Sequence, residues 1–217
     1  MVGIMGAKKN PLHSLDTYVF IDVSNIRLAC YKTLGFKIDF ARLLDYFKQK
    51  YPNLKDVRYY EGIAKGDAWK QRMFNYLAQR GYTICSLERK SYNAVEKEER
   101  EIKCPKCGNE WVAEFARERK AMKSNVDVYL ATELLNVAIT AAKPIHVILV
   151  SCDGDYAEMI ESALNNPNVS ISVLATPPAR DVKRNTLSVK LRALRKSAPC
   201  YRLLDISNFK DRVKREK

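Results

Sequence analysis

The sequence predicts a three-layer α/β protein built around a mostly parallel central sheet. Short apolar runs typical of buried strands recur along the chain, and helical patterns fall between most of them. Two of these runs end abruptly in carboxylates. The 217 residues suffice for one domain with a sizeable core. No apolar run approaches the roughly 20 residues that span a membrane, so we expect no membrane partner.

The predicted strands are runs rich in Val, Ile, Leu and Tyr. They are Tyr18–Asp22, Val57–Gly62, Tyr82–Leu87, His146–Ser151, Val169–Ala175 and Tyr201–Asp205. Parallel strands that follow one another along the chain need crossover connections, which place helices on both faces of the sheet.

Helices are predicted where apolar residues recur at i, i+3, i+4 and i+7. Asp39 is the expected N-cap of the first, and Asp67 and Gly81 bound the second. A third begins near Ser124, and a fourth follows Asp155. The four helices fit between predicted strands and support the α/β interpretation.

Residues 88–120 interrupt this alternation, and we interpret them as an inserted hairpin. In this segment 17 of 33 residues are charged, 9 basic and 8 acidic. Residues 101–103 and 111–113 are predicted to pair. We expect the hairpin to extend from the sheet rather than fill its core.

The centre of the insertion, Cys-Pro-Lys-Cys-Gly, resembles half of a zinc ribbon. A structural zinc ion takes four ligands, and Cys104 and Cys107 supply two thiolates. The site could be completed by the distant Cys85 or Cys200, or by a second subunit in a homodimer. The alternative is that the pair stays reduced and free of metal.

Carboxylates stand where two predicted strands end and where a helix begins. Asp22 follows the first strand, Asp153 and Asp155 follow the fourth, and Asp127 opens the helix between them. Ligands bind outside the carboxyl ends of the strands in open α/β sheets, so these acids are expected to share one crevice. Carboxylates held close together repel one another, and a divalent cation relieves that repulsion. Oxygen-only ligands favour Mg²⁺ or Mn²⁺.

Two of these acids have structural alternatives. Asp127 could complement the helix dipole, and Asp155 could be the N-cap of the following helix. No such alternative is expected for Asp153, and Asp127 is expected to point toward the sheet. Both histidines are remote from the acids, since His13 lies in the N-terminal segment and His146 begins its strand. The sequence therefore indicates a metal-dependent phosphodiesterase rather than histidine-based catalysis.

The net charge of +13 is concentrated near the C-terminus. Residues 179–217 contain 13 Lys and Arg against four acids, which is typical of binding to a phosphate backbone. Arg192, Arg195 and Lys196 are candidate contacts to nucleic acid, with a solvated surface as the alternative.

The ends of the chain are expected to lie outside the folded domain. We expect residues 1–16 to form a flexible tail without a secretory signal, residues 207–217 to form a basic tail, and the protein to be cytoplasmic.

Three ordered blocks of the sequence resemble the LabA-like NYN domains, relatives of the PIN nucleases. They are residues 21–26, 125–131 and 151–156. The resemblance covers residues 17–206 apart from the insertion. It implies a PIN-like three-layer fold and a ribonuclease that acts with Mg²⁺ or Mn²⁺ on single-stranded RNA.

By position, the resemblance also implies the site residues. Asp22, Asp127, Asp153 and Asp155 would be the catalytic, metal-binding acids, and Asn25 is their polar neighbour. Asn25 and Ser151 are candidate substrate contacts.

Three positions depart from the glycines common in that family. They hold Val23, Asn125 and Cys152. We expect Val23 and Cys152 to crowd a substrate strand. The alternative function is therefore a non-catalytic nucleic-acid-binding or regulatory adaptor that keeps the pocket.

Overall fold

The computed structural model describes residues 11–178 and 187–216. The first ten residues of the expected N-terminal tail, residues 179–186 of the basic region and Lys217 lie outside the described part. Within it, no helix is both long and apolar enough to cross a membrane.

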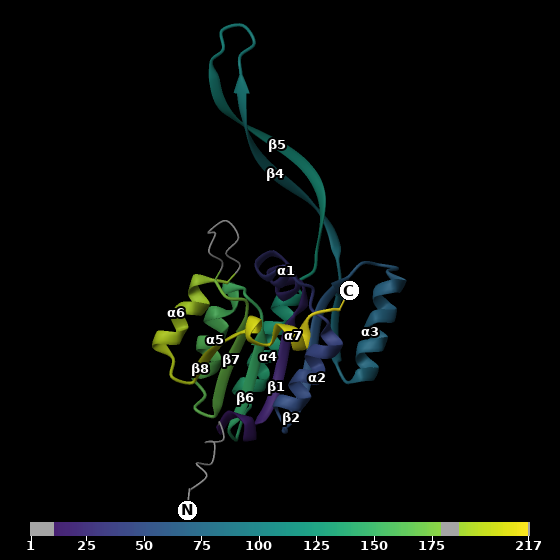
Figure 1. Cartoon of the computed structure of the whole chain (residues 1–217), viewed down its shortest axis with the longest axis vertical. Coiled ribbons are helices and arrows are strands. Elements are labelled where there is room, and N and C mark those ends of the chain that lie inside the picture. The colour runs from purple at the N-terminus through teal and green to yellow at the C-terminus, as the bar shows by residue number, and fades with distance from the viewer. Residues whose placement is uncertain (1–10, 179–186, 217) are drawn as a thin grey trace, which may run out of the picture.

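The body is a six-stranded sheet in which every pair of neighbours is parallel, with the order β3-β2-β1-β6-β7-β8 (Figure 1). The strands are β1 (Asp16–Asp22), β2 (Leu54–Ile63), β3 (Thr83–Glu88), β6 (Ile145–Val150), β7 (Val169–Ala175) and β8 (Tyr201–Asp205). All six predicted strands are confirmed. The chain builds outward from β1 to β3 and then returns to the other side of β1. The point between β1 and β6 is therefore a topological switch point, where α/β sheets bind ligands.

Helices cover both faces of the sheet, so the three-layer prediction is confirmed. One face carries α1 (Val23–Leu34), α2 (Phe40–Lys50) and α3 (Ala68–Arg80); the other carries α4 (Val126–Ile139), α5 (Ala157–Leu164) and α6 (Val189–Ser197). Successive residues of a strand point to opposite faces. Phe40 of α2 packs on Tyr59, with ring centroids 5.1 Å apart, whereas Tyr129 of α4 packs on Tyr60 at 5.6 Å.

The predicted helix boundaries follow from local hydrogen bonds. The carboxylate of Asp39 accepts from the N–H groups of Ala41 and Arg42 and caps α2. Asp67 caps α3 in the same way, and α3 ends at Gly81 with a φ of 112°. Helix α1 was not among the predicted helices.

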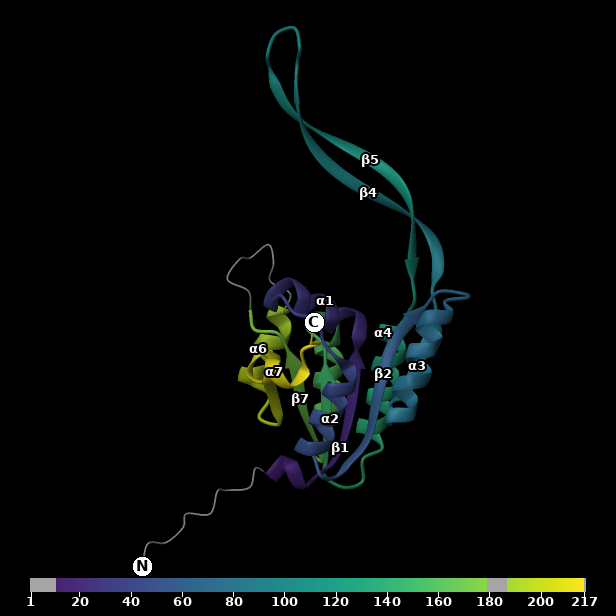
Figure 2. The same cartoon turned by 45° about the vertical axis from the view of Figure 1, so that its right-hand side comes forward.

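The insertion is a long antiparallel hairpin, β4 (Lys90–Lys103) and β5 (Glu110–Lys123). Residues 101–103 pair with residues 110–112, so the predicted pairing is confirmed within one residue, although the ladder is far longer than predicted. Figures 1 and 2 show the hairpin rising from the body beyond the carboxyl ends of the strands. At its base, a Cβ on Gly62 of β2 would lie 2.1 Å from Ser124 Oγ, so glycine lets the second leg pass close to the sheet.

The last residues, expected as a basic tail, pack on the body. After the 3₁₀ turn η4 (Ile206–Phe209), helix α7 (Lys210–Val213) lies against α2. Val213 is fully buried, and its carbonyl accepts a 2.8 Å hydrogen bond from the Asp39 N–H. Arg215 donates its N–H to Lys37 at 2.8 Å. The C-terminal segment therefore covers one side of helix α2.

Candidate active site

Asp22 lies at the switch point of the sheet. It is the last residue of β1 and the N-cap of α1, where its Oδ1 accepts a 3.2 Å hydrogen bond from the Asn25 N–H. Ile21 pairs with Val150 in the parallel register, so the next residues of the two segments, Asp22 and Ser151, lie side by side. The Ser151 hydroxyl donates to Asp22 Oδ2 at 3.4 Å. The first carboxylate of the predicted site is thus held by the first turn of α1 and by the residue that follows β6.

Tyr156 is a site residue that the sequence did not reveal. It is buried at the end of the short 3₁₀ turn η2 (Gly154–Tyr156), and its hydroxyl donates to Asp22 Oδ2 at 3.3 Å. In the sequence, Tyr156 fits the apolar spacing of the helix that follows, so it reads as a core residue. Its ring does pack in the core, while its hydroxyl faces the acids.

Asp153 both faces Asp22 and caps η2. Its Oδ1 accepts from the Asp155 N–H at 3.1 Å, and its own N–H donates to Ser151 Oγ at 3.1 Å. Two expectations are therefore wrong: Asp153 does have a capping role, and Asp155 is not the cap. Asp155 is the residue whose N–H is capped, and its own side chain is exposed.

The electrostatics of Asp22 distinguish it from an ordinary capping acid. Burial raises the pKa of its carboxyl to about 6, and the negative charge of Asp153 adds to the increase. The hydrogen bonds from Asn25, Tyr156 and Ser151 act in the opposite direction without cancelling it. A carboxylate that is costly to ionise beside a second carboxylate gains from an added positive charge.

Asp127 lies in the first turn of α4. Leu130 and Leu134, on the predicted stripe, are fully buried. Asp127 itself is exposed rather than turned into the sheet. Its charge contributes to the raised pKa of Tyr156, whose hydroxyl contacts Asp22, so Asp127 belongs to the same group of acids.

Asn25 is half-buried, and its side-chain oxygen holds the backbone after β6. Its Oδ1 accepts a 2.8 Å hydrogen bond from the Cys152 N–H and ties α1 to the loop after β6. Val23 and Cys152 are 0% and 1% exposed, and the Cys152 thiol lies 3.4 Å from the Thr176 hydroxyl. The expectation that Val23 and Cys152 crowd a substrate is therefore wrong, because both side chains point into the core.

The donor atoms suit a hard divalent cation. Asp22, Asp153 and Asp127 supply carboxylate oxygens. The pKa of Asp22 is raised mainly by burial, with a smaller contribution from the charge of Asp153. Over residues 11–178 and 187–216, no three Asp, Glu, His or Cys side chains already form a metal-binding cluster. The residues fit such an ion, which would have to draw Asp127 toward the closer pair.

The N-terminus of helix α6 packs on the turn after Asp153 and brings one basic residue, Lys190, beside it. The Ser188 N–H donates to the Cys152 carbonyl at 3.1 Å, and Ser188 packs directly on Gly154. Lys190 lies in the first turn, with its Nζ 3.8 Å from Glu158. The predicted substrate contacts lie farther along α6, with Arg192 half-buried and both Arg195 and Lys196 exposed in the last turn.

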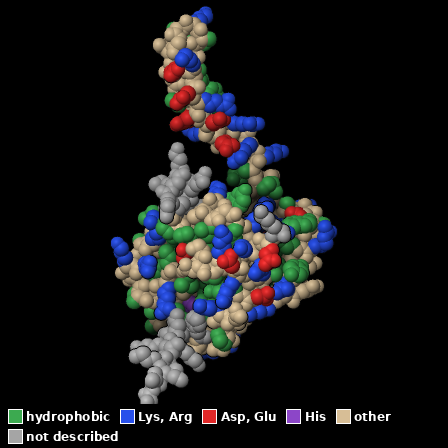
Figure 3. All heavy atoms as spheres, in the orientation of Figure 1, with side chains coloured by type: hydrophobic (Ala, Val, Ile, Leu, Met, Phe, Trp, Pro, Cys, Tyr) green, Lys and Arg blue, Asp and Glu red, His purple; other side chains and the backbone are tan. Residues whose placement is uncertain are grey.

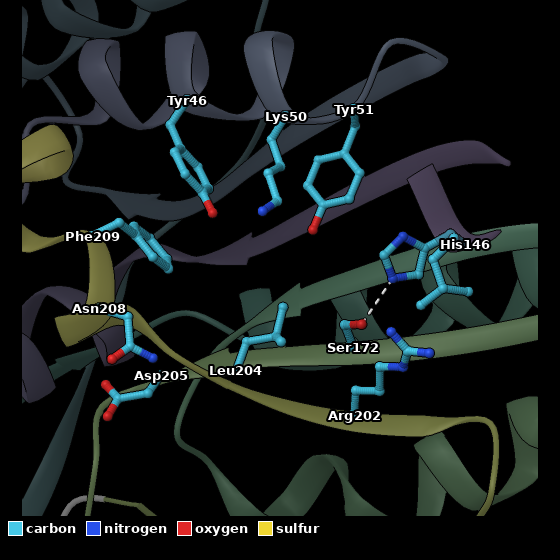
Figure 4. A pocket seen from close by; sticks show the side chains of 11 residues that line it. Tyr46, Lys50, Tyr51, His146, Ser172, Arg202, Leu204, Asp205, Asn208 and Phe209 are labelled. Carbon is cyan, nitrogen blue, oxygen red and sulfur yellow. Dashed lines mark hydrogen bonds between the residues drawn. The ribbon is translucent and has the colours of Figure 1, made fainter. Parts of the chain in front are cut away.

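A second hollow, a cavity of about 230 Å³, opens between α2 and β8 on the face of the sheet that α2 covers (Figure 4). Its walls include Lys50 and Arg202, and His146 Nε2 lies 2.8 Å from Ser172 Oγ. His146 is at the start of β6, as predicted, remote from Asp153 at the other end. The one carboxylate in the lining, Asp205, accepts from the Ser207 N–H. This hollow lacks paired acids, so the acids around Asp22 form the candidate active site.

Comparisons with known proteins identify the family and the fold. The NYN domain family matches residues 16–192, which contain all four acids. A solved structure of a protein of unknown function from Vibrio parahaemolyticus is similar, with a TM-score of 0.55 and 18% sequence identity. The similarity covers 89% of this chain and 95% of that one and shows a shared fold. No curated protein matches the chain.

Proposed function

The chain belongs to the NYN domain family, a PIN-like nuclease-type domain, and from this premise we propose that it hydrolyses phosphodiester bonds in RNA at the crevice around Asp22. Mg²⁺ or Mn²⁺ would be the cofactor, and single-stranded RNA the substrate. The net charge of +13 supports a polyanionic partner.

One observation carries the proposal, namely the state of Asp22. Its carboxyl is buried at the switch point, its pKa is raised to about 6, and Asp153 adds negative charge beside it. An acid with only a structural role is usually paired with a cation or fully hydrogen-bonded, and its pKa is then lowered. The crevice instead concentrates negative charge, as metal-dependent phosphoryl chemistry requires.

Asp22 and Asp153 would hold the ion, with Asp127 and Asp155 as further acids. A bound divalent cation would lower the pKa of an attacking water and stabilise the departing oxygen. Tyr156 and Ser151 orient the Asp22 carboxylate by their hydroxyl groups. Lys190, at the N-terminus of α6, is placed to bind a substrate phosphate, and Arg195 and Lys196 would extend that contact along the helix.

A second candidate function is a binding adaptor without turnover. It is favoured by the capping roles of Asp22 and Asp153, since both acids stabilise helix starts whether or not a metal binds. Under this alternative the protein would bind RNA but leave it intact.

The test is cleavage of labelled single-stranded RNA and DNA by metal-stripped protein, with and without Mn²⁺. Wild-type protein should cut RNA only when Mn²⁺ is present. Asp153→Asn should abolish cleavage, because asparagine keeps an oxygen that can cap η2 but removes the charge that holds the ion. RNA binding should remain.

Asp39→Asn is the matched control. Asp39 also caps a helix, but α2 lies on the other face of the sheet. This variant should cleave at the wild-type rate. If wild-type protein binds RNA and never cuts any RNA or DNA tested, the adaptor function replaces the nuclease.

A further inference from the structure

We propose that the tip of the β4–β5 hairpin is half of a zinc site and that two copies of the chain join tip to tip around one zinc ion. The four ligands would be Cys104 and Cys107 of each copy. The proposal does not depend on the nuclease activity.

The turn at the tip has the form of a metal-binding knuckle. The backbone N–H groups of Cys107 and Lys106 point at the Cys104 sulfur. Gly108, with a φ of 76°, donates its N–H to the Cys104 carbonyl at 2.9 Å, and the Cys104 N–H donates to the Asn109 carbonyl at 2.8 Å. These bonds hold the turn closed and keep the two cysteines in the spacing used by zinc ribbons.

One chain cannot complete the site. Cys30, Cys85 and Cys152 are buried in the body. Cys200, although exposed, precedes β8 at the end of the sheet opposite the hairpin. Figures 1 and 2 show the tip held far from all parts of the body. Neither Cys85 nor Cys200 can therefore be the missing ligand. The residues that the structure does not describe contain no Cys or His that could take their place.

A second copy supplies what the tip lacks. Structural zinc takes four ligands in a tetrahedron, and a two-fold axis through the ion doubles a pair of thiolates to four. A two-fold contact needs a surface that is complementary to itself. The hairpin tip of a second copy of the chain can therefore supply the two missing ligands.

The surface next to the knuckle suits such a contact. Ile102 and Trp111 pair across the ladder, and Phe115 lies on the same face, with Trp111 49% and Phe115 43% exposed. Arg100 lies over the Phe115 ring at 5.5 Å. A two-stranded ribbon is only marginally stable when both faces meet water, so covering these rings would stabilise the hairpin.

The charge of the hairpin also permits self-association. Figure 3 shows acidic and basic side chains interleaved along the stem. Ion pairs such as Lys97 with Glu114 and Lys103 with Glu110 balance them across the ladder. The tips of two such hairpins meet without net repulsion, whereas a nucleic-acid groove would favour a strongly basic ribbon.

The experiment measures zinc content and mass of the full chain purified under reducing conditions. Wild-type protein should contain one zinc per two chains and sediment as a dimer. Small-angle scattering should give a maximum dimension close to twice that of the monomer, because the tips are the parts that meet. A metal chelator should return the monomer.

Cys104→Ser and Cys107→Ser should each lose zinc and the dimer while keeping the thermal unfolding temperature of the body. Cys200→Ser is the matched control, since it also removes an exposed thiol, and it should keep both zinc and the dimer. The proposal is overturned by protein without zinc, by one zinc per monomer, or by a dimer that survives the loss of Cys104.

Discussion

Asp22→Asn should stabilise the protein at neutral pH in the absence of metal. The change removes a charge that the fold disfavours, because burial and the neighbouring Asp153 raise the pKa of the carboxyl from 3.8 to about 6. The hydrogen bonds can survive. Oδ1 still accepts from Asn25, and the hydroxyls of Ser151 and Tyr156 can rotate to accept from the new NH₂ group.

The size of the effect follows from linkage between protonation and folding. A pKa difference of this size corresponds to at most about 3 kcal/mol. Because the side chain is still partly open to the crevice, solvent screening should reduce the gain to about 1–2 kcal/mol, or a rise in Tm of roughly 2–8 °C for a domain of this length.

The pH dependence identifies the source of the gain. Well below pH 3.8, the ordinary pKa of the group, the carboxyl is protonated in both folded and unfolded wild-type protein, so no electrostatic penalty exists. Between about pH 4 and 6 the unfolded chain ionises first, and the folded state loses stability as the pH rises. The advantage of Asp22→Asn should therefore grow over this interval and level off above about pH 7.

Urea unfolding of both proteins from pH 4 to 8 measures this difference directly. Adding Mn²⁺ should raise the free energy of unfolding of the wild type more than that of the variant, since the ion relieves the same repulsion. A variant that is less stable than wild type at pH 7, or whose advantage does not change with pH, would refute the assigned electrostatics. A gain of equal size and pH dependence in Asp39→Asn would assign the effect to helix capping instead.

Two further changes test how α6 is attached and what it contacts. Gly154→Ala should destabilise the protein by about 1–3 kcal/mol, because the new Cβ would lie 2.1 Å from Ser188 Oγ. Thermal unfolding of the double variant with Ser188→Gly should recover most of the loss, and no recovery would locate the strain elsewhere. Replacing Arg192, Arg195 and Lys196 by Ala should weaken the binding of RNA of every sequence. The dependence of affinity on salt should become shallower by the equivalent of up to about three phosphate contacts. An unchanged salt slope in a filter-binding titration would remove α6 from the interface.

The sheet could be predicted because parallel strands are buried on both faces and therefore form continuous apolar runs. β6 is the clearest case, since all six of its residues are buried. Helices α2 and α3 carried visible caps. Helix α1 escaped prediction because Leu28 and Tyr31 are 51% and 59% exposed, which blurs its apolar stripe.

The acids of the site could be located from the sequence, but their roles could not. A carboxylate after a strand predicts a place at the edge of the sheet, whereas the capping bond of Asp153 depends on the exact turn that follows. The contact from Tyr156 joins residues more than a hundred positions apart, as does the packing of Val213. Such long-range pairings leave no local pattern.

The order of strands in the sheet sets when the acid crevice comes into existence. β1 leaves the ribosome early, but its neighbour β6 follows roughly 130 residues later, an interval on the order of ten seconds at ordinary rates of synthesis. The β4–β5 hairpin is made in between and needs only its own residues to pair. Asp22 therefore has neither Asp153 nor Ser151 beside it until most of the chain has been made. A nascent chain that stops before β6 can form the hairpin but has only one half of the crevice.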